Sequence, residues 1–341
     1  MGIMPHVDVD EALRLALSLD IPFWPQLPRV CYGEDMYVQA ARHFPGILID
    51  VENSRLVFDS VRFQEELVDY SRRMEQPEPF SLNSEHSLTY HRFLTHELRQ
   101  YPAIRGQIAG PISLGFNVVD ENRKPIIYDD EVRGLLFDFI QRKVNVQYRE
   151  LRERNPHAFV WVDEPALLFV FSGLYGYNDI QARQDYRVFL QEVEGPKALH
   201  LCPNVNLPYL LALGVDILSF DAYQIELMPR EYARPVAEFI RNGGTISWGI
   251  VPTERAGLDA ETPQSLCGRL IQYWEVVSGS AGIPARRIAE QALVAPARCC
   301  VRDAGERKQA CYAPNVEQES VARAFSYLHE ISQMLRHKYS I

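Results

Sequence analysis

The feature that most constrains the fold is an alternation of short apolar runs with longer amphipathic stretches. Runs rich in β-branched and aromatic residues are typical of buried strands, and the stretches between them have helical spacing. Strands that alternate with helices pair in parallel through right-handed crossovers, so the pattern predicts an α/β fold with helices covering the sheet. The predicted strands are 21–27, 104–109, 158–162, 197–201, 215–220, 245–250 and 292–295.

Two architectures suit this pattern, a doubly wound sheet and a (β/α)8 TIM barrel. A barrel needs one more strand, and the remaining candidate is a short or truncated one at residues 2–5. Residues 46–59 contain two extended runs joined by Glu-Asn-Ser, which predicts an inserted β-hairpin within an excursion over about residues 44–83. Because such barrels commonly exceed about 150 residues, we predict a single barrel domain over residues 1–341.

Charge and composition exclude several classes of protein. The formal net charge is −10, from 35 Lys and Arg against 45 Asp and Glu, whereas proteins that bind nucleic acid concentrate positive charge. No apolar run approaches about 18 residues, and the start of the chain has no leader pattern, so we expect a cytoplasmic protein that does not bind a membrane. Six cysteines are too few for a disulfide scaffold, which leaves thiols, core residues or metal ligands.

The strand ends carry residues that suit a metal ion. His200 and Cys202 stand two apart at the end of a predicted strand, so their side chains project to the same side. Imidazole and thiolate suit Zn²⁺, for which Cys299 or Cys300 is a candidate third ligand and Asp221 a candidate oxygen ligand. The alternative is a strand-end histidine beside cysteines that only pack, since free cysteine is among the most buried residue types.

Two further strand ends suit a small-molecule substrate. Pro165 prevents simple helical continuation after Asp163, whose carboxylate we expect at the barrel mouth, where it can bind an ammonium group. The alternative role for Asp163 is a helix N-cap. The segment from Gly110 to Ser113 lets a ligand approach the backbone, or else forms a tight turn between a strand and a helix.

In their order along the chain, these strand ends resemble a known family. The sequence is similar to the catalytic C-terminal barrel of cobalamin-independent methionine synthase, in the superfamily it shares with uroporphyrinogen decarboxylase. The resemblance spans nearly the whole chain. It rests on Gly-Pro-Ile-Ser at 110–113, Trp-Val-Asp-Glu-Pro-Ala at 161–166, His-Leu-Cys at 200–202, Ser-Phe-Asp-Ala-Tyr at 219–223, and the segment 296–300, with a weaker echo in Gly-Glu-Asp-Met at 33–36.

The resemblance implies roles for individual residues. It implies a zinc ion bound by His200, Cys202, Asp221 and one of Cys299 and Cys300. It further implies that Asp163 holds the ammonium group of the substrate at the catalytic centre, with Gly110, Ser113 and Glu34 as further substrate-binding residues. Three features differ from the family: Asp221 replaces a glutamate, the late motif reads Pro-Ala-Arg-Cys-Cys, and residues 248–252 contain no histidine.

The resemblance therefore predicts a zinc-dependent methyltransferase that moves a methyl group to a small-molecule thiol, homocysteine, to give methionine. Zinc would activate the thiol, because coordination deprotonates a group whose ordinary pKa is near 8.5. The family's N-terminal half, which helps bind the folate donor, is missing, so we expect methylcobalamin as donor, with a corrinoid protein as partner. The alternatives are methylation of another thiol of the coenzyme M type, and a metal-free decarboxylase-like member of the superfamily.

Overall fold

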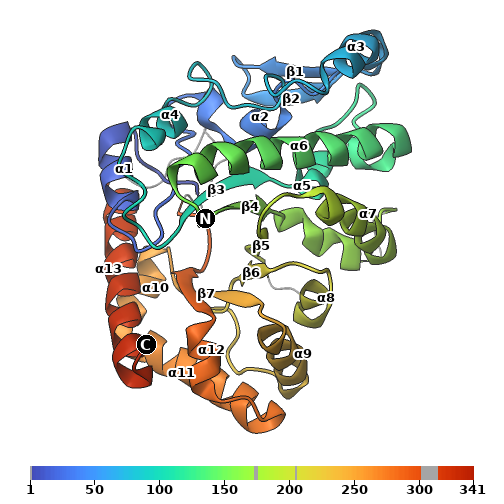
Figure 1. Cartoon of the computed structure of the whole chain (residues 1–341). Coiled ribbons are helices and arrows are strands. Elements are labelled where there is room, and N and C mark those ends of the chain that lie inside the picture. The colour runs from blue at the N-terminus through green and yellow to red at the C-terminus, as the bar shows by residue number, and fades with distance from the viewer. Residues whose placement is uncertain (1, 173–175, 204–205, 301–313) are drawn as a thin grey trace. The chain divides into compact units, whose positions relative to one another are not determined.

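The computed structural model describes residues 2–172, 176–203, 206–300 and 314–341 (Figure 1). The chain forms two compact units, which we describe separately. The N-terminal unit comprises Gly2 and Val7–Lys197, and the C-terminal unit comprises Ile3–His6 and Ala198–Ile341.

The N-terminal unit is built on two buried parallel strands. Strands β3 (Ile104–Ala109) and β4 (Ala158–Asp163) pair in register from Ile104 opposite Ala158 to Ala109 opposite Asp163. The long helix α6 (Asp130–Arg154) connects the two strands and packs on both, as expected for a parallel crossover. The unit also contains helices α1 (Val9–Ala16), α5 (Pro111–Asn117) and α7 (Asp179–Glu192), and short 3-10 turns η1 (Tyr32–Glu34), η2 (Ile126–Tyr128) and η3 (Pro165–Phe171).

The prediction of a strand over residues 21–27 is wrong. In this segment two single residues, Phe23 and Gln26, form isolated bridges, and that of Phe23 is parallel, opposite Arg105 of β3. The physical reason is the spacing of prolines: Pro22 and Pro25 have no N–H group to donate, so the segment cannot continue a ladder.

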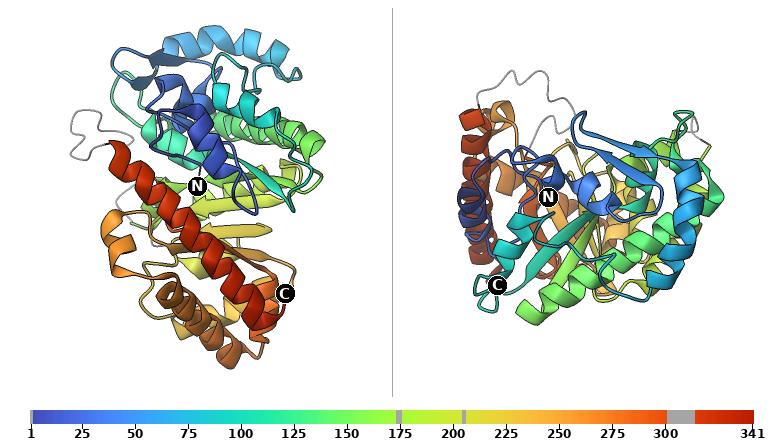
Figure 2. Two further views of the ribbon diagram at one scale, coloured as in Figure 1. Left: turned by 90° about the vertical axis from the view of Figure 1, so that its left-hand side faces the viewer. Right: turned by 90° about the horizontal axis from the view of Figure 1, so that it is seen from above.

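The predicted inserted hairpin is confirmed. Strands β1 (Ile47–Asp50) and β2 (Arg55–Phe58) are antiparallel. The hairpin lies beside helix α3 (Ser60–Arg73), as the blue elements of Figure 2 show, and the Gly46 N–H donates to Glu66 of that helix at 2.8 Å. Helices α2 (Met36–Ala41) and α4 (Leu88–Leu94) flank this excursion in the sequence.

The described part of the C-terminal unit contains four parallel strands in sequence order, which confirms the predicted strands 197–201, 215–220, 245–250 and 292–295 to within a few residues. They are β5 (Lys197–Leu201), β6 (Ile217–Phe220), β7 (Thr245–Val251) and β8 (Ala292–Pro296). The helices of its described part are α8 (Leu207–Leu211), α9 (Arg230–Arg241), α10 (Arg255–Ala260), α11 (Pro263–Ala281), α12 (Ala285–Glu290) and α13 (Pro314–Tyr339). Helix α11 packs on both α9 and α13, and α13 packs on β8 (Figure 1).

The fold class is therefore α/β with parallel strands, whereas a complete (β/α)8 barrel is not confirmed. The candidate strand at residues 2–5 contributes an extended segment rather than a named strand: the Gly2 carbonyl accepts from Gln26 N at 2.7 Å, and the Ile3 carbonyl accepts from Cys300 N at 3.3 Å. A single barrel domain over 1–341 stays a prediction. Within the described ranges, none of the helices combines the length and apolar character needed to cross a bilayer.

Candidate functional site

The end of β5 brings two predicted ligands together. His200 lies opposite Ser219 of β6 in the parallel register, and its Nδ1 is 2.9 Å from the Ser219 hydroxyl. The other ring nitrogen, Nε2, is 3.2 Å from the sulfur of Cys202. His200 is almost fully buried. The sheet register therefore fixes the imidazole between a hydroxyl and a thiol.

Asp221, directly after β6, is engaged by a cation that the sequence reasoning missed. Its carboxylate accepts from Arg298 Nε at 2.8 Å and from the side chain and backbone N–H of Gln224. Burial raises the pKa of Asp221, and the contacts with Arg298 and Gln224 oppose this shift. Arg298 also interacts electrostatically with Cys202. One feature of the sequence could have indicated this contact. Arg298 lies in the late segment 296–300, beside the two cysteines that were considered as metal ligands.

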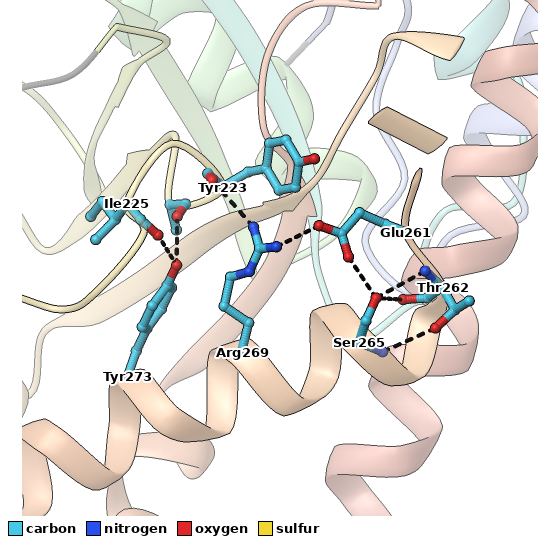
Figure 3. A network of polar contacts seen from close by, with 8 residues as sticks. Tyr223, Ile225, Glu261, Thr262, Ser265, Arg269 and Tyr273 are labelled. Carbon is cyan, nitrogen blue, oxygen red and sulfur yellow. Dashed lines mark hydrogen bonds and ion pairs between the residues drawn. The ribbon is translucent and has the colours of Figure 1, made fainter. Parts of the chain in front are cut away.

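A polar network from α11 holds the loop that follows Asp221 (Figure 3). The guanidinium of Arg269 stacks over the Tyr223 ring, 5.0 Å from its centre, and pairs with Glu261. The Tyr273 hydroxyl donates to the backbone carbonyl of Ile225. Because these contacts tie the loop to a helix of the same unit, the carboxylate of Asp221 lies on a supported segment.

The late cysteines do not complete a metal-binding group with these residues. The backbone N–H of Cys300 donates to Ile3, and the carbonyl of Cys299 accepts from the Thr253 hydroxyl at 3.3 Å. Among the residues that the structure describes, no three His, Cys, Asp or Glu side chains are grouped so that they could hold a metal ion. A zinc site takes three or four such ligands. The described side chains thus fall short of a zinc shell, and zinc stays a prediction.

Asp163, in the N-terminal unit, ends β4 with a carboxylate that lacks a complete set of partners. The residue is only 4% exposed, and its Oδ1 makes no hydrogen bond in the described structure. Burial raises the pKa of Asp163 to about 6, and the positive charge of Arg105 opposes the shift. A buried carboxylate oxygen without a partner is costly, and a cationic ligand would remove that cost.

The neighbouring Glu164 has a role that the sequence reasoning missed. It is fully buried and accepts from the backbone N–H groups of Ile112 and Ser113, at 2.9 and 2.7 Å, and from the hydroxyls of Ser113 and Tyr186. Glu164 therefore caps the first turn of α5 from a distant part of the chain. A Cβ at Gly110 would lie 2.3 Å from this carboxylate, which explains the glycine there. The predicted substrate roles of Gly110 and Ser113 stay predictions.

Glu34 is also placed by internal contacts. Its buried carboxylate accepts from the backbone N–H of Thr89 at 3.2 Å, from the Ser87 hydroxyl at 3.3 Å and from the Gln39 amide at 3.1 Å. Burial raises the pKa of Glu34, and the hydrogen bonds from Thr89 and Ser87 oppose the shift. The carboxylate thus joins the N-terminus of α4 to α2, and its predicted role in substrate binding stays a prediction.

Comparison with known proteins gives structural likenesses alone. No protein-family model and no curated protein sequence matches the chain. Among solved structures it is similar to a B12-independent methionine synthase from a Shewanella species in complex with selenomethionine, with 13% identity, a TM-score of 0.47, and coverage of 76% of this chain and 67% of that one. A protein from Listeria monocytogenes assigned as a vitamin-B12-independent methionine synthase gives 14% identity, a TM-score of 0.41 and coverage of 68% and 64%. We therefore argue the function from the side chains described above.

Proposed function

We propose that the chain is a methyltransferase that moves a methyl group to the sulfur of a small thiol, with homocysteine as the acceptor and a methylcorrinoid as the donor. The observation that carries the proposal is the contact between His200 and Cys202 at the carboxyl end of β5, where a parallel sheet presents its reactive side chains. The same two residues belong to the His-Leu-Cys motif, on which the resemblance to the methionine synthase family partly rests.

Asp163 supports the choice of homocysteine. This acceptor carries an ammonium group, and the unpartnered Oδ1 of Asp163 is a buried acceptor suited to it. A thiol without an ammonium group, such as coenzyme M, gains nothing from this carboxylate. The two classes of acceptor therefore differ in whether their binding depends on the carboxylate of Asp163.

The reaction joins the acceptor sulfur to the methyl carbon while the bond between that carbon and the donor breaks, and the bonding electron pair leaves with the donor. The thiol proton must be lost before or during the attack, because the thiolate is the nucleophile. In this proposal His200 and Cys202 bind the acceptor sulfur. The role of Asp163 toward the ammonium group is taken from the motif resemblance. Zinc belongs to the proposal as the family's expected means of thiol activation, and a corrinoid protein as the expected methyl carrier.

The test is methyl transfer from methylcobalamin to homocysteine by the purified chain, with the zinc content measured on the same sample. His200→Ala and Cys202→Ser are expected to lower the rate by about 100-fold or more, the range for loss of a positioned catalytic group. Cys31→Ser is the matched control, because Cys31 is exposed and lies in the other unit. Methyl transfer that survives both substitutions contradicts the proposal.

Asp163→Asn tests the acceptor. We expect the KM for homocysteine to rise by about tenfold or more, because an ionic hydrogen bond to the ammonium group is lost. Activity toward coenzyme M should then be unchanged. An unchanged KM for homocysteine would instead favour an acceptor without an ammonium group.

One observation favours a second candidate, a metal-free decarboxylase-like enzyme. Arg298 occupies the carboxylate of Asp221 and also interacts with Cys202, so a cation already stands beside two of the predicted metal ligands. This candidate is supported if the protein contains no zinc, transfers no methyl group and decarboxylates a porphyrinogen.

A further inference from the structure

The excursion after α2 forms an open cleft that the proposed methyl transfer does not use. It has a volume of about 380 Å³ and lies in the N-terminal unit, between the end of α2, the strand β1 and the helix α3. Its walls carry the apolar side chains of Phe44, Ile47 and Ile49 together with basic residues, among them Arg42 and Arg73. This volume is within the range of small-molecule sites.

Among the described residues, Arg42 is a basic residue of this cleft with no hydrogen bond or ion pair from its side chain. Two other arginines of the wall are paired, Arg62 with Glu66 at 2.6 Å and Arg73 with Asp69 at 3.7 Å. In the described structure the guanidinium of Arg42 makes no hydrogen bond or ion pair, and its Nε is buried. Burial accordingly lowers the pKa of Arg42. Arg42 is half-buried, and a bound anion would supply the counter-charge that its guanidinium lacks.

A second donor without a partner lines the same cleft. Tyr70 is 7% exposed, and within the described ranges its hydroxyl makes no hydrogen bond. Buried hydroxyl groups nearly always find an acceptor. Arg42 and Tyr70 thus line one cleft with a charged and a neutral hydrogen-bonding side chain, a combination that suits a carboxylate or a phosphate group.

The neighbouring His43 lies among several positively charged side chains. It directly follows the end of α2 with a φ of 71°, in the left-handed region where a helix is usually followed by glycine or asparagine. Its partial burial and then four basic neighbours, Lys143 of α6, Arg42, His86 and Arg73 of α3, lower its pKa to about 4. No acidic group is among these influences, so the surroundings of His43 are electropositive.

We propose that this cleft binds a small molecule through its carboxylate or phosphate group, held by Arg42 and Tyr70, while an apolar portion lies against Phe44, Ile47 and Ile49. The inference is independent of the methyl transfer proposed above. It rests on donors in the excursion, whereas the methyl-transfer site is argued from strand ends.

The experiment is calorimetric titration of the full chain with octanoate and, separately, with octyl phosphate, which distinguish the two head groups. Binding of at least one is expected. Arg42→Met should weaken it by at least about tenfold, because a charge-assisted hydrogen bond is lost, and Tyr70→Phe should weaken it by a few-fold. Arg55→Met is the matched control. Arg55 lies in the same hairpin, is 64% exposed, pairs with Asp50 and does not line the cleft.

Absence of binding for both probes at millimolar concentration overturns the proposal, as does binding that Arg42→Met leaves unchanged. A readout on the unmodified protein covers the case in which a variant fails to fold. When the probe saturates the cleft, the pKa of His43 should rise, because the bound anion offsets the positive charges around the imidazole. NMR titration measures this pKa. A bound probe that leaves this pKa unchanged also overturns the proposal. Methyl transfer should be the same in Arg42→Met and in the unmodified chain.

Discussion

At the scale of single residues, two adjacent carboxyl groups have opposite surroundings. Glu164 accepts four hydrogen bonds from fixed donors, whereas one oxygen of Asp163 accepts none in the described structure. Both lie in a buried environment that raises their pKa. Protein interiors rarely keep a polar atom without a partner unless it serves a function. Asp163 is therefore the member of the pair that is available to a ligand.

This difference predicts a gain of stability on removing the charge of Asp163. Its pKa is about 6 in the folded protein against an ordinary value of 3.8, so the folded state holds its proton more tightly. The contribution of Asp163 to folding stability is then most favourable at low pH and falls as the pH rises from about 4 to about 6. Asp163→Asn removes that loss and should raise the free energy of unfolding at pH 7 by about 1–3 kcal/mol, with little difference at pH 4. Urea unfolding at the two pH values measures the effect.

Glu164→Gln is the matched contrast and should have the opposite sign at pH 7. An amide NH₂ group would face the N–H groups that now donate to the carboxylate, so we expect a loss of about 1–3 kcal/mol. If Asp163→Asn is as destabilising as Glu164→Gln, the unpartnered oxygen is not the source of strain at this strand end.

At the scale of elements, the sequence predicts those parts that depend on local pattern. The strands at 104–109, 158–162 and 197–201 are buried along nearly their whole length and appear where expected. The segment 21–27 has the composition of a strand but fails because its prolines cannot donate to a neighbour. Arg298 on Asp221 was missed because they are joined by a contact between strand ends far apart in the chain. Such contacts depend on register and loop path, which no local pattern encodes.

The close approach of β6, β7 and β8 predicts that Gly249 cannot be replaced. A Cβ at this position would lie 2.6 Å from the carbonyl oxygen of Phe220 and 3.1 Å from Cα of Ala297, which are backbone atoms on two sides. Gly249→Ala should therefore lower the free energy of unfolding by at least about 2 kcal/mol.

Gly268→Ala is the control within the same unit. Gly268 lies inside α11, and a Cβ there meets no atom within 4 Å, so alanine should raise stability by up to about 1 kcal/mol. Thermal unfolding of both variants compares them. Equal stability of Gly249→Ala and the unmodified chain would show that the strands separate easily at this point.

At the scale of the whole molecule, the unit boundaries do not follow the order of the chain. Ile3–His6 belongs to the C-terminal unit, although the next residues belong to the other one. Met4 has no exposed surface, and Ile3 accepts a hydrogen bond from Cys300. The core of the C-terminal unit therefore includes side chains from the start of the sequence.

This arrangement predicts that Met4 contributes strongly to stability. Met4→Ala removes a fully buried side chain and should cost about 2–5 kcal/mol, whereas Val7→Ala, at a residue 57% exposed, should change stability by less than about 0.5 kcal/mol. Denaturant titration of both variants gives the comparison. A small effect of Met4→Ala would mean that the initial segment detaches without disturbing the core.

The hydrogen bond between Ile3 and Cys300 also affects the order in which the two units can fold during synthesis. A ribosome makes residue 300 only after residues 4–299, so the C-terminal unit cannot form this hydrogen bond until that whole stretch has been synthesised. Val7–Lys197, by contrast, is synthesised as one uninterrupted length and can fold while the remainder is still being made. A nascent chain halted shortly after residue 200 would thus contain a folded N-terminal unit. Its segment Ile3–His6 would still lack the C-terminal unit to which it belongs.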